Sequence, residues 1–217
     1  MGSHQAPAEQ RKRKTCFVTI GATTGFQTLM AAVMTPEFIM ALAKHRYSHL
    51  ILQHGADGHE QFKLAEETTG RIMSTFTDSN AAAAWNSINI TGFGMDPAGL
   101  DSYFKLAKGL ASKDDEEGLV ISHAGSGTIL AAMRMAMPLV VVPNELLLDN
   151  HQVELAEELA SQGYVVHGRV NELPAAIDKT EKLRKQLHGW PPVNSGASAR
   201  SGGGIQAVMD EEMGFLD

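Results

Sequence analysis

Two polar segments contain the groups best suited to bind a substrate. The first is the glycine turn Gly125-Ser126-Gly127-Thr128, which follows a short apolar run and precedes a stretch of helical period. Glycines lack a Cβ, so such a turn brings backbone N–H groups close to a ligand, and the nearby helix start attracts an anion such as a diphosphate. The same residues also suit a tight strand-to-helix turn with nothing bound. The sequence permits both interpretations.

The second segment covers residues 143–152 and is rich in hydrogen-bonding side chains, namely Asn144, Glu145, Asn150, His151 and Gln152. Amides and imidazoles donate and accept hydrogen bonds, so they suit recognition of sugar hydroxyls. A structural explanation competes, because Asp149 and Gln152 have the spacing of a capping box at a helix start. Such a cap would still leave His151 for a ligand.

Three further residues lie next to these segments or in an equivalent turn. His123 ends the apolar run before the glycine turn, where a lone histidine is more often a structural donor than a base. Gly21 and Thr23 belong to an earlier turn, Gly21 to Gly25, which also follows a β-branched run. We include all three as candidate contacts. The catalytic base remains unassigned.

Motif spacing argues against metal ions and common cofactors. Leu130 occupies the third glycine position of G-x-G-x-x-G, which disfavours a nicotinamide cofactor, and the P-loop pattern is absent. No H-E-x-x-H or G-x-S-x-G pattern occurs, and a single cysteine, Cys16, cannot supply a zinc site. We expect neither a metal nor a cofactor.

Short apolar runs must position these segments. Leu119 to Ile121, Leu139 to Val142 and Tyr164 to Val166 alternate with segments of helical period, and Cys16 to Ile20 and His49 to Gln53 precede them as further strands. This alternation predicts parallel strands joined by crossover helices, with ligands at the carboxyl ends of the strands. The predicted fold is therefore α/β: a Rossmann-like single domain, with a mostly parallel sheet flanked by helices.

The remaining elements are predicted less uniformly. A helix over 27–45 should restart at Pro36 with Thr35 as its cap, and further helices are expected over 100–110 and 171–188. Residues 69–96 mix an alanine run with a strand-like alternation. The charged run from Lys113 to Glu117 is expected in a solvated loop.

We divide the chain into a disordered basic tail (1–14), the Rossmann-like domain (15–187), a flexible linker (188–204) and a C-terminal docking helix (205–217). The linker is rich in proline, glycine and serine. The last segment is short, acidic and has an apolar stripe at helical spacing: Ile205, Val208, Met209 and Met213. A helix this short is marginal alone, so we expect it to dock onto the body or onto a partner.

Charge and hydropathy exclude several classes of protein. The 217 residues have a net charge of -7, whereas a nucleic-acid-binding surface is basic. No apolar run approaches the ~20 residues that span a bilayer, and no signal peptide is visible. The single cysteine suits a reducing compartment. We expect an intracellular chain with no membrane span of its own.

Several motifs in sequence order form a longer pattern: VTIGATTGF, ISHAGSGT and VPNELLLDNHQVELAEEL. Together they resemble the C-terminal, donor-binding half of GT-B glycosyltransferases. The pattern is most similar to the family of small cytosolic subunits of the eukaryotic UDP-GlcNAc transferase, over roughly residues 15–179.

The resemblance implies a catalytic subunit, active only with a partner, that moves GlcNAc from UDP-GlcNAc to dolichyl-diphosphate GlcNAc with inversion. This would be the second step of lipid-linked oligosaccharide assembly for N-glycosylation. Gly125 to Thr128 would lie under the diphosphate, while Asn150, His151 and Gln152 would face the sugar. A membrane-anchored partner subunit would bind the acceptor and recruit this cytoplasmic chain to the cytosolic face of the endoplasmic reticulum. One Rossmann-like domain is half of a GT-B enzyme, which also favours a partner.

The sequence departs from the family at two positions. Ala131 stands where members usually have a glutamate that contacts the ribose, and Ala136 stands where glycine is common. Ribose contact must then come from elsewhere, for example from Glu145, or donor affinity is weakened. Two alternatives follow: a non-catalytic scaffold subunit with a degenerate donor site, and a stand-alone dehydrogenase that uses Glu145 on a ribose. Leu130 makes the dehydrogenase the weakest of the three.

Overall fold

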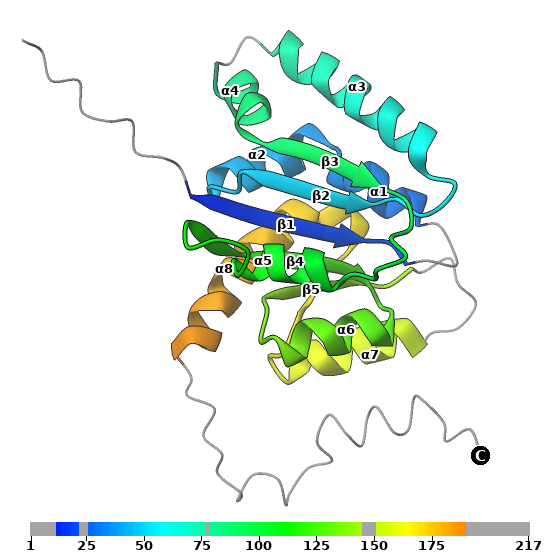
Figure 1. Ribbon diagram of the computed structural model, residues 1–217, viewed down its shortest axis with the longest axis vertical. Coiled ribbons are helices and arrows are strands. Elements are labelled where there is room, and N and C mark those ends of the chain that lie inside the picture. The colour runs from blue at the N-terminus through cyan, green and yellow to red at the C-terminus, as the bar shows by residue number, and fades with distance from the viewer. Residues whose placement is uncertain (1–11, 22–25, 77–78, 145–150, 190–217) are drawn as a thin grey trace, which may run out of the picture.

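The chain forms a three-layer α/β structure around one parallel sheet (Figure 1). The computed structural model describes residues 12–21, 26–76, 79–144 and 151–189. Its six strands are β1 (Arg13–Thr19), β2 (His49–Gln53), β3 (Asn89–Phe93), β4 (Asp115–His123), β5 (Leu139–Val142) and β6 (Val166–His167). They follow the order β3-β2-β1-β4-β5-β6, and every neighbouring pair is parallel. This is the strand order of a Rossmann-like fold, whose switch point lies between β1 and β4.

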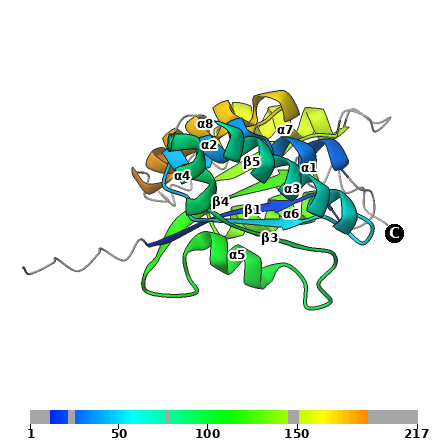
Figure 2. The same ribbon diagram turned by 90° about the horizontal axis from the view of Figure 1, so that it is seen from above.

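The helices cover both faces of the sheet. They are α1 (Gln27–Val33), α2 (Pro36–Lys44), α3 (His59–Thr75), α4 (Ser79–Ser87), α5 (Asp101–Lys108), α6 (Ser126–Arg134), α7 (His151–Ser161) and α8 (Leu173–Gly189), with a 3-10 turn, η1 (Val170–Glu172), before α8. One apolar cluster contains buried side chains of α1 to α4 and α8, and a second contains those of α5, α6 and α7. Figure 2 shows α2 and α8 on one side of the sheet and α5 on the other.

The predicted strands and helices with strong patterns are present. Residues 16–18, 119–121 and 139–142 lie fully buried in β1, β4 and β5, as continuous apolar runs in a parallel sheet should. The helix break at Pro36 is also confirmed, because the Thr35 hydroxyl accepts a hydrogen bond from the Phe38 N–H at 3.4 Å. Gly109, in the left-handed conformation with φ 77°, ends α5.

The mixed signals in residues 69–96 come from three elements. Helix α3 ends at Thr75, α4 contains the alanine run, and β3 is an edge strand with largely exposed residues. Gly92 in β3 allows a close approach of Phe62, since a Cβ there would lie 2.6 Å from that ring. An edge strand with this exposure has no strong hydrophobic alternation to detect.

Two expectations about charged residues were wrong. Strand β1 begins at Arg13, so Arg13 and Lys14 belong to the sheet and not to a tail. The run expected in a solvated loop contributes Asp115 to Glu117 to the start of β4. The reason is pairing: the Arg13 Nε atom donates to Asp115 Oδ1 at 2.9 Å, and only 3% of the Asp115 side chain is exposed.

A second set of paired charges joins α8 to the amino ends of β1 and β4. The Arg184 guanidinium donates to the Glu117 carboxylate at 2.9 Å, to the Gly118 carbonyl at 2.7 Å and to the Tyr47 hydroxyl at 3.0 Å. Glu181 accepts from Lys14 Nζ at 3.0 Å and from the Tyr47 hydroxyl at 2.8 Å. Burial alone would raise the pKa of Glu181, but the Arg184 charge and these hydrogen bonds hold it below its usual range. The network fixes α8 at the amino edge of the sheet, opposite the carboxyl ends of the strands.

Other expectations concern residues outside the ranges that the structure describes. The tail before residue 12 and the proposed docking helix are among them, so these parts of the domain division stay predictions. The linker was expected to begin at residue 188, which is wrong, because α8 continues to Gly189 and ends before the residue that precedes Pro191. The rest of the expected linker, residues 190–204, also lies outside the described residues. Among the described residues, no helix is both long enough and apolar enough to cross a membrane.

Candidate substrate-binding site

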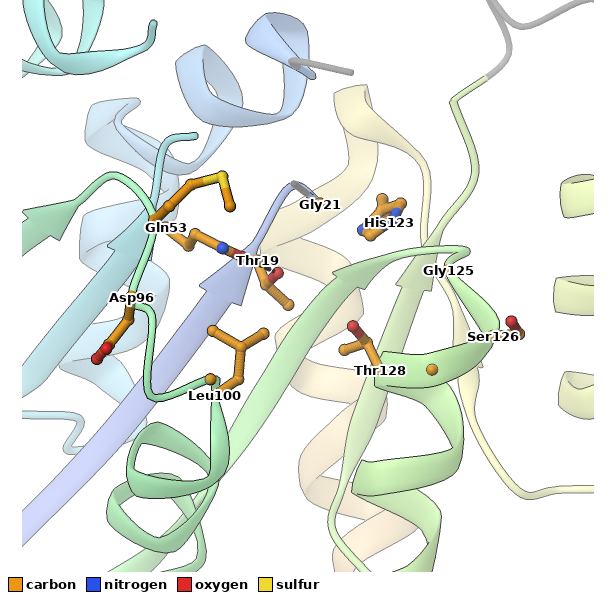
Figure 3. A pocket seen from close by; sticks show the side chains of 12 residues that line it. Thr19, Gly21, Gln53, Asp96, Leu100, His123, Gly125, Ser126 and Thr128 are labelled. Carbon is orange, nitrogen blue, oxygen red and sulfur yellow. Dashed lines mark hydrogen bonds between the residues drawn. The ribbon is translucent and has the colours of Figure 1, made fainter. Parts of the chain in front are cut away.

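A cavity of about 400 Å³ lies at the carboxyl edge of the sheet, at the switch point between β1 and β4 (Figure 3). It is lined by the ends of β1, β2 and β4, by the β3–α5 loop and by the first turn of α6: Thr19, Gly21, Gln53, Met95, Asp96, Gly99, Leu100, His123, Gly125, Ser126, Gly127 and Thr128. We call it the first cavity. Strand ends of this kind are where open parallel sheets bind their ligands.

The glycine turn forms one wall of the first cavity. Helix α6 begins at Ser126 with Gly125 as its N-cap, so the N–H groups of its first turn are at the cavity. Gly127 is exposed, and a Cβ built on it would meet no atom within 4 Å. This arrangement of free space, backbone donors and the positive end of a helix dipole suits a phosphate group.

His123 separates this turn from the first βα turn. A Cβ on Gly21 would lie 2.8 Å from the His123 Nε2 atom, and a Cβ on Gly125 would lie 2.5 Å from the same atom. The imidazole therefore occupies the space that both glycines leave open, as Figure 3 shows. Only a glycine at each place allows the ring to lie here.

The environment of His123 favours the neutral ring. Burial lowers its pKa below the ordinary value of 6.5, although the backbone carbonyl of Thr19 opposes the shift. Its Nδ1 atom is buried and makes no well-formed hydrogen bond to any residue within the described ranges. A neutral imidazole beside a phosphate site can donate or accept one hydrogen bond without adding a charge.

Sequence reasoning missed the side of the cavity formed by β1, β2 and the β3–α5 loop. Thr19 and Gln53 are register partners at the ends of β1 and β2, and their buried side chains hydrogen-bond to each other. Asp96 is held by the Ala98 N–H and the Tyr103 hydroxyl, each at 2.9 Å. Polar residues that end adjacent strands could have identified the first pair, and an Asp-Pro turn after a strand could have identified Asp96.

The second predicted segment begins beside a different cavity. This second cavity, of about 550 Å³, is lined by Phe26, Thr28, Pro143, Asn144, Arg169, Val170 and Asn171. The Asn144 N–H donates to the Gln152 Oε1 atom at 3.3 Å, which ties the end of β5 to the first turn of α7. His151 is exposed at the start of α7.

The structure therefore brings together only part of the predicted site. Gly21, His123 and the glycine turn share the first cavity, and Asn144 lies in the second. Thr23, Glu145, Asn150 and the proposed cap Asp149 lie outside the described residues. Their contacts stay predictions, as does the role of Gln152 at a sugar. Within the described ranges, no residue of the second segment lines the first cavity.

The two residues that depart from the family pattern, Ala131 and Ala136, lie in α6 and just after it. Ala131 is partly buried and packs against the second apolar cluster. Ala136, just past the end of α6, has φ 48°, a left-handed conformation that glycine adopts without strain. The glycine preference at that position thus has a conformational explanation.

The chain is similar in sequence to known glycosyltransferases. Residues 102–189 match the family model described as the glycosyltransferase family 28 C-terminal domain. The UDP-N-acetylglucosamine transferase subunit ALG13 of Saccharomyces cerevisiae is 33% identical over 161 residues, which cover 71% of this chain and 77% of that protein. The subunit of the same name from Candida albicans is 24% identical over 190 residues, covering 83% of this chain and 64% of that protein. The chain thus spans less than two thirds of the Candida albicans protein.

Among solved structures, an NMR solution structure of ALG13 is similar, with a TM-score of 0.54 and 25% identity, covering 81% of this chain and 87% of that one. The parallel sheet, the glycine turn at its carboxyl edge and the family 28 match define a glycosyltransferase domain. The predicted Rossmann-like fold, with a parallel sheet flanked by helices, is confirmed. More closely, the chain belongs to the family of the UDP-N-acetylglucosamine transferase subunit ALG13.

Proposed function

We propose that the chain is the donor-binding, catalytic subunit of a heteromeric enzyme that transfers GlcNAc from UDP-GlcNAc to dolichyl-diphosphate GlcNAc. The relatives are named as UDP-N-acetylglucosamine transferase subunits, which supports this donor. The structural observation that supports it best is the first cavity, with backbone donors of Gly125 to Thr128 at a helix start.

In the proposed reaction, a hydroxyl oxygen of the acceptor sugar attacks the anomeric carbon as the bond to UDP breaks, and the configuration inverts. The negative charge on the leaving diphosphate is stabilised by the N–H groups and dipole of α6, a form of electrostatic catalysis that needs no metal. The neutral His123 ring lies beside the same turn. The proton of the attacking hydroxyl passes to a general base.

Contact with the ribose has a new candidate. Ala131 removes the carboxylate that the family usually provides, but Asp96 lies in the first cavity, fixed by two hydrogen bonds. A carboxylate there can accept hydrogen bonds from ribose hydroxyls. Asp96 joins Glu145 as a candidate replacement within the proposed donor site.

The acceptor requires a second polypeptide in this proposal. The relatives' names call them subunits, and the chain belongs to their family. We propose that a membrane-anchored partner binds the lipid acceptor and holds this chain at the cytosolic face of the endoplasmic reticulum. The partner then brings the lipid-linked acceptor to the donor site, although no described helix of this chain can span a membrane.

The test compares two isosteric variants at Gly127 in the complex with the partner subunit. Because a side chain at Gly127 meets open space, Gly127→Asp and Gly127→Asn should both fold. Only the aspartate repels a diphosphate, so we expect it to abolish transfer from UDP-GlcNAc to a dolichyl-diphosphate GlcNAc analogue, while the asparagine variant keeps measurable transfer. If Gly127→Asp transfers GlcNAc as fast as Gly127→Asn, the glycine turn does not bind a phosphate group.

The scaffold alternative is favoured by one observation, the apolar environment of Ala131 where a ribose-contacting carboxylate is expected. Calorimetry of UDP-GlcNAc binding to the assembled complex distinguishes the two proposals. Saturable binding that Gly127→Asp abolishes supports the catalytic subunit. A complex that transfers GlcNAc yet shows no contribution of this chain to donor binding supports the scaffold.

A further inference from the structure

The second cavity differs from the first in the charge of its lining. Among its described residues Arg169 provides a guanidinium, Asn144 and Asn171 provide amides and Thr28 provides a hydroxyl, and none of them is acidic. The described lining of the first cavity is the reverse, with the carboxylate of Asp96 and no lysine or arginine. Of these two cavities, only the second has a positively charged side chain, Arg169, in its described lining.

Both cavities open at the same edge of the sheet. The first lies at the ends of β1, β2 and β4, and the second lies between the start of α1, the end of β5 and η1. Gly21 lines the first and Phe26, five positions later in the chain, lines the second. Five residues span at most about 18 Å, so ligands in the two cavities would be neighbours.

Backbone packing fixes the position of Arg169. The preceding Gly168 donates its N–H to the Val141 carbonyl at 2.8 Å, and a Cβ on Gly168 would lie only 2.6 Å from Val140. The Arg169 carbonyl then accepts from the Glu172 N–H at 2.9 Å, which starts η1. Strand β5 and η1 thus hold the arginine backbone at the cavity.

The guanidinium is available to a ligand. Its one described ion pair is with Glu172, at 4.0 Å between Nη1 and Oε1, and the two side chains are 59% and 51% exposed. Exposed pairs at such a distance contribute little. A phosphate or diphosphate, by contrast, offers Arg169 two oxygens in the geometry that a guanidinium prefers.

We propose that the partner subunit holds the lipid of the acceptor while the second cavity of this chain binds its diphosphate, with Arg169 as the charge partner and the amides of Asn144 and Asn171 as hydrogen-bonding neighbours. The inference rests on the proposed function, in which both substrates contain a diphosphate but only that of the donor leaves. The acceptor diphosphate stays intact throughout, so Arg169 is a positioning residue. It orients the acceptor sugar toward the donor in the first cavity.

Steady-state kinetics of the complex with its partner subunit test this directly, using a short-chain analogue of dolichyl-diphosphate GlcNAc. Loss of a charge-assisted hydrogen bond predicts that Arg169→Gln raises the KM for the acceptor by about 10- to 100-fold. Arg169→Lys should recover part of the loss, and the KM for UDP-GlcNAc should change less than about twofold in both variants. Lys182→Gln, an exposed charge change on α8, is the matched control and should leave both constants unaltered.

Two further measurements make the result specific. An acceptor analogue with an uncharged linker in place of the diphosphate should be used equally well, or equally poorly, by wild type and Arg169→Gln. Calorimetric binding of the charged analogue to the complex without donor should weaken in Arg169→Gln. Unchanged binding and unchanged acceptor KM would overturn the inference, whereas failure of the wild-type complex to transfer GlcNAc would overturn the proposed function instead.

Discussion

The contact between His123 and its two flanking glycines predicts a coupled effect of substitutions on stability. Gly125 has φ -76° and ψ 121°, a backbone conformation open to alanine, but the added Cβ would lie 2.5 Å from the His123 Nε2 atom. The ring would have to move out of its half-buried position. Gly125→Ala is therefore expected to destabilise the protein through this one contact.

The magnitude follows from three contributions. Overpacking of a buried site costs about 1–3 kcal/mol. Replacing glycine by alanine in a compatible conformation restricts the unfolded chain and recovers about 0.4–1 kcal/mol. Alanine is also a poorer N-cap than glycine, a loss of similar size, roughly 0.5–1 kcal/mol. We expect Gly125→Ala to lower the free energy of unfolding by about 1–3 kcal/mol in wild type and by almost nothing in a His123→Ala background.

Urea unfolding of the four chains of this double-mutant cycle, followed by circular dichroism, measures the coupling. Gly21→Ala serves as the comparison. Its Cβ would also meet His123, at 2.8 Å, but Gly21 has φ 87°, so alanine there is strained with or without the ring. Removing His123 should rescue Gly125→Ala almost fully and Gly21→Ala only in part. If Gly125→Ala costs the same in both backgrounds, the ring does not occupy the space between the glycines.

Three other substitutions give independent checks. Arg184→Met removes one partner each of the largely buried Glu117 and Glu181, which keep Lys108 and Lys14, and should lower the free energy of unfolding by about 1.5–3 kcal/mol, against about 0.5 kcal/mol or less for the exposed control Lys182→Met, both measured in urea. Ala136→Gly relieves a left-handed alanine and should raise the melting temperature, by an amount equivalent to about 0.5–1 kcal/mol; a lower melting temperature would contradict the conformational argument. Because the folded pKa of His123 lies below the unfolded value of 6.5, the unfolded state takes up its proton first as the pH falls, so stability is lost below about pH 6.5. His123→Ala should show a smaller loss between pH 7 and pH 5, and parallel curves for the two chains would show that His123 does not contribute.

The sequence was sufficient for the interior of the fold and insufficient at its margins. Continuous apolar runs identified β1, β4 and β5, because strands buried on both faces have no polar positions to obscure them. Strand β3 was ambiguous because it lies at an exposed edge. The acidic start of β4 was misassigned because Asp115 and Glu117 are buried through partners far away in the chain, Arg13 and Arg184.

The residues of the candidate site were likewise predictable only where a local sequence pattern marks them. The glycine turn and His123 could be found because local spacing alone marks a strand-to-helix turn. Thr19 and Gln53 could not, since each resembles an ordinary strand residue until the register of β1 and β2 aligns them. The separation of Asn144 from the first cavity also depends on which face of the sheet each loop follows, which periodicity does not reveal.

The position of the His123 ring between two loops has a mechanical consequence. The imidazole fills the space between Gly21, just after the end of β1, and Gly125 at the start of α6. Close packing leaves little free volume there, so a backbone shift at either glycine toward the ring would require the ring to move as well.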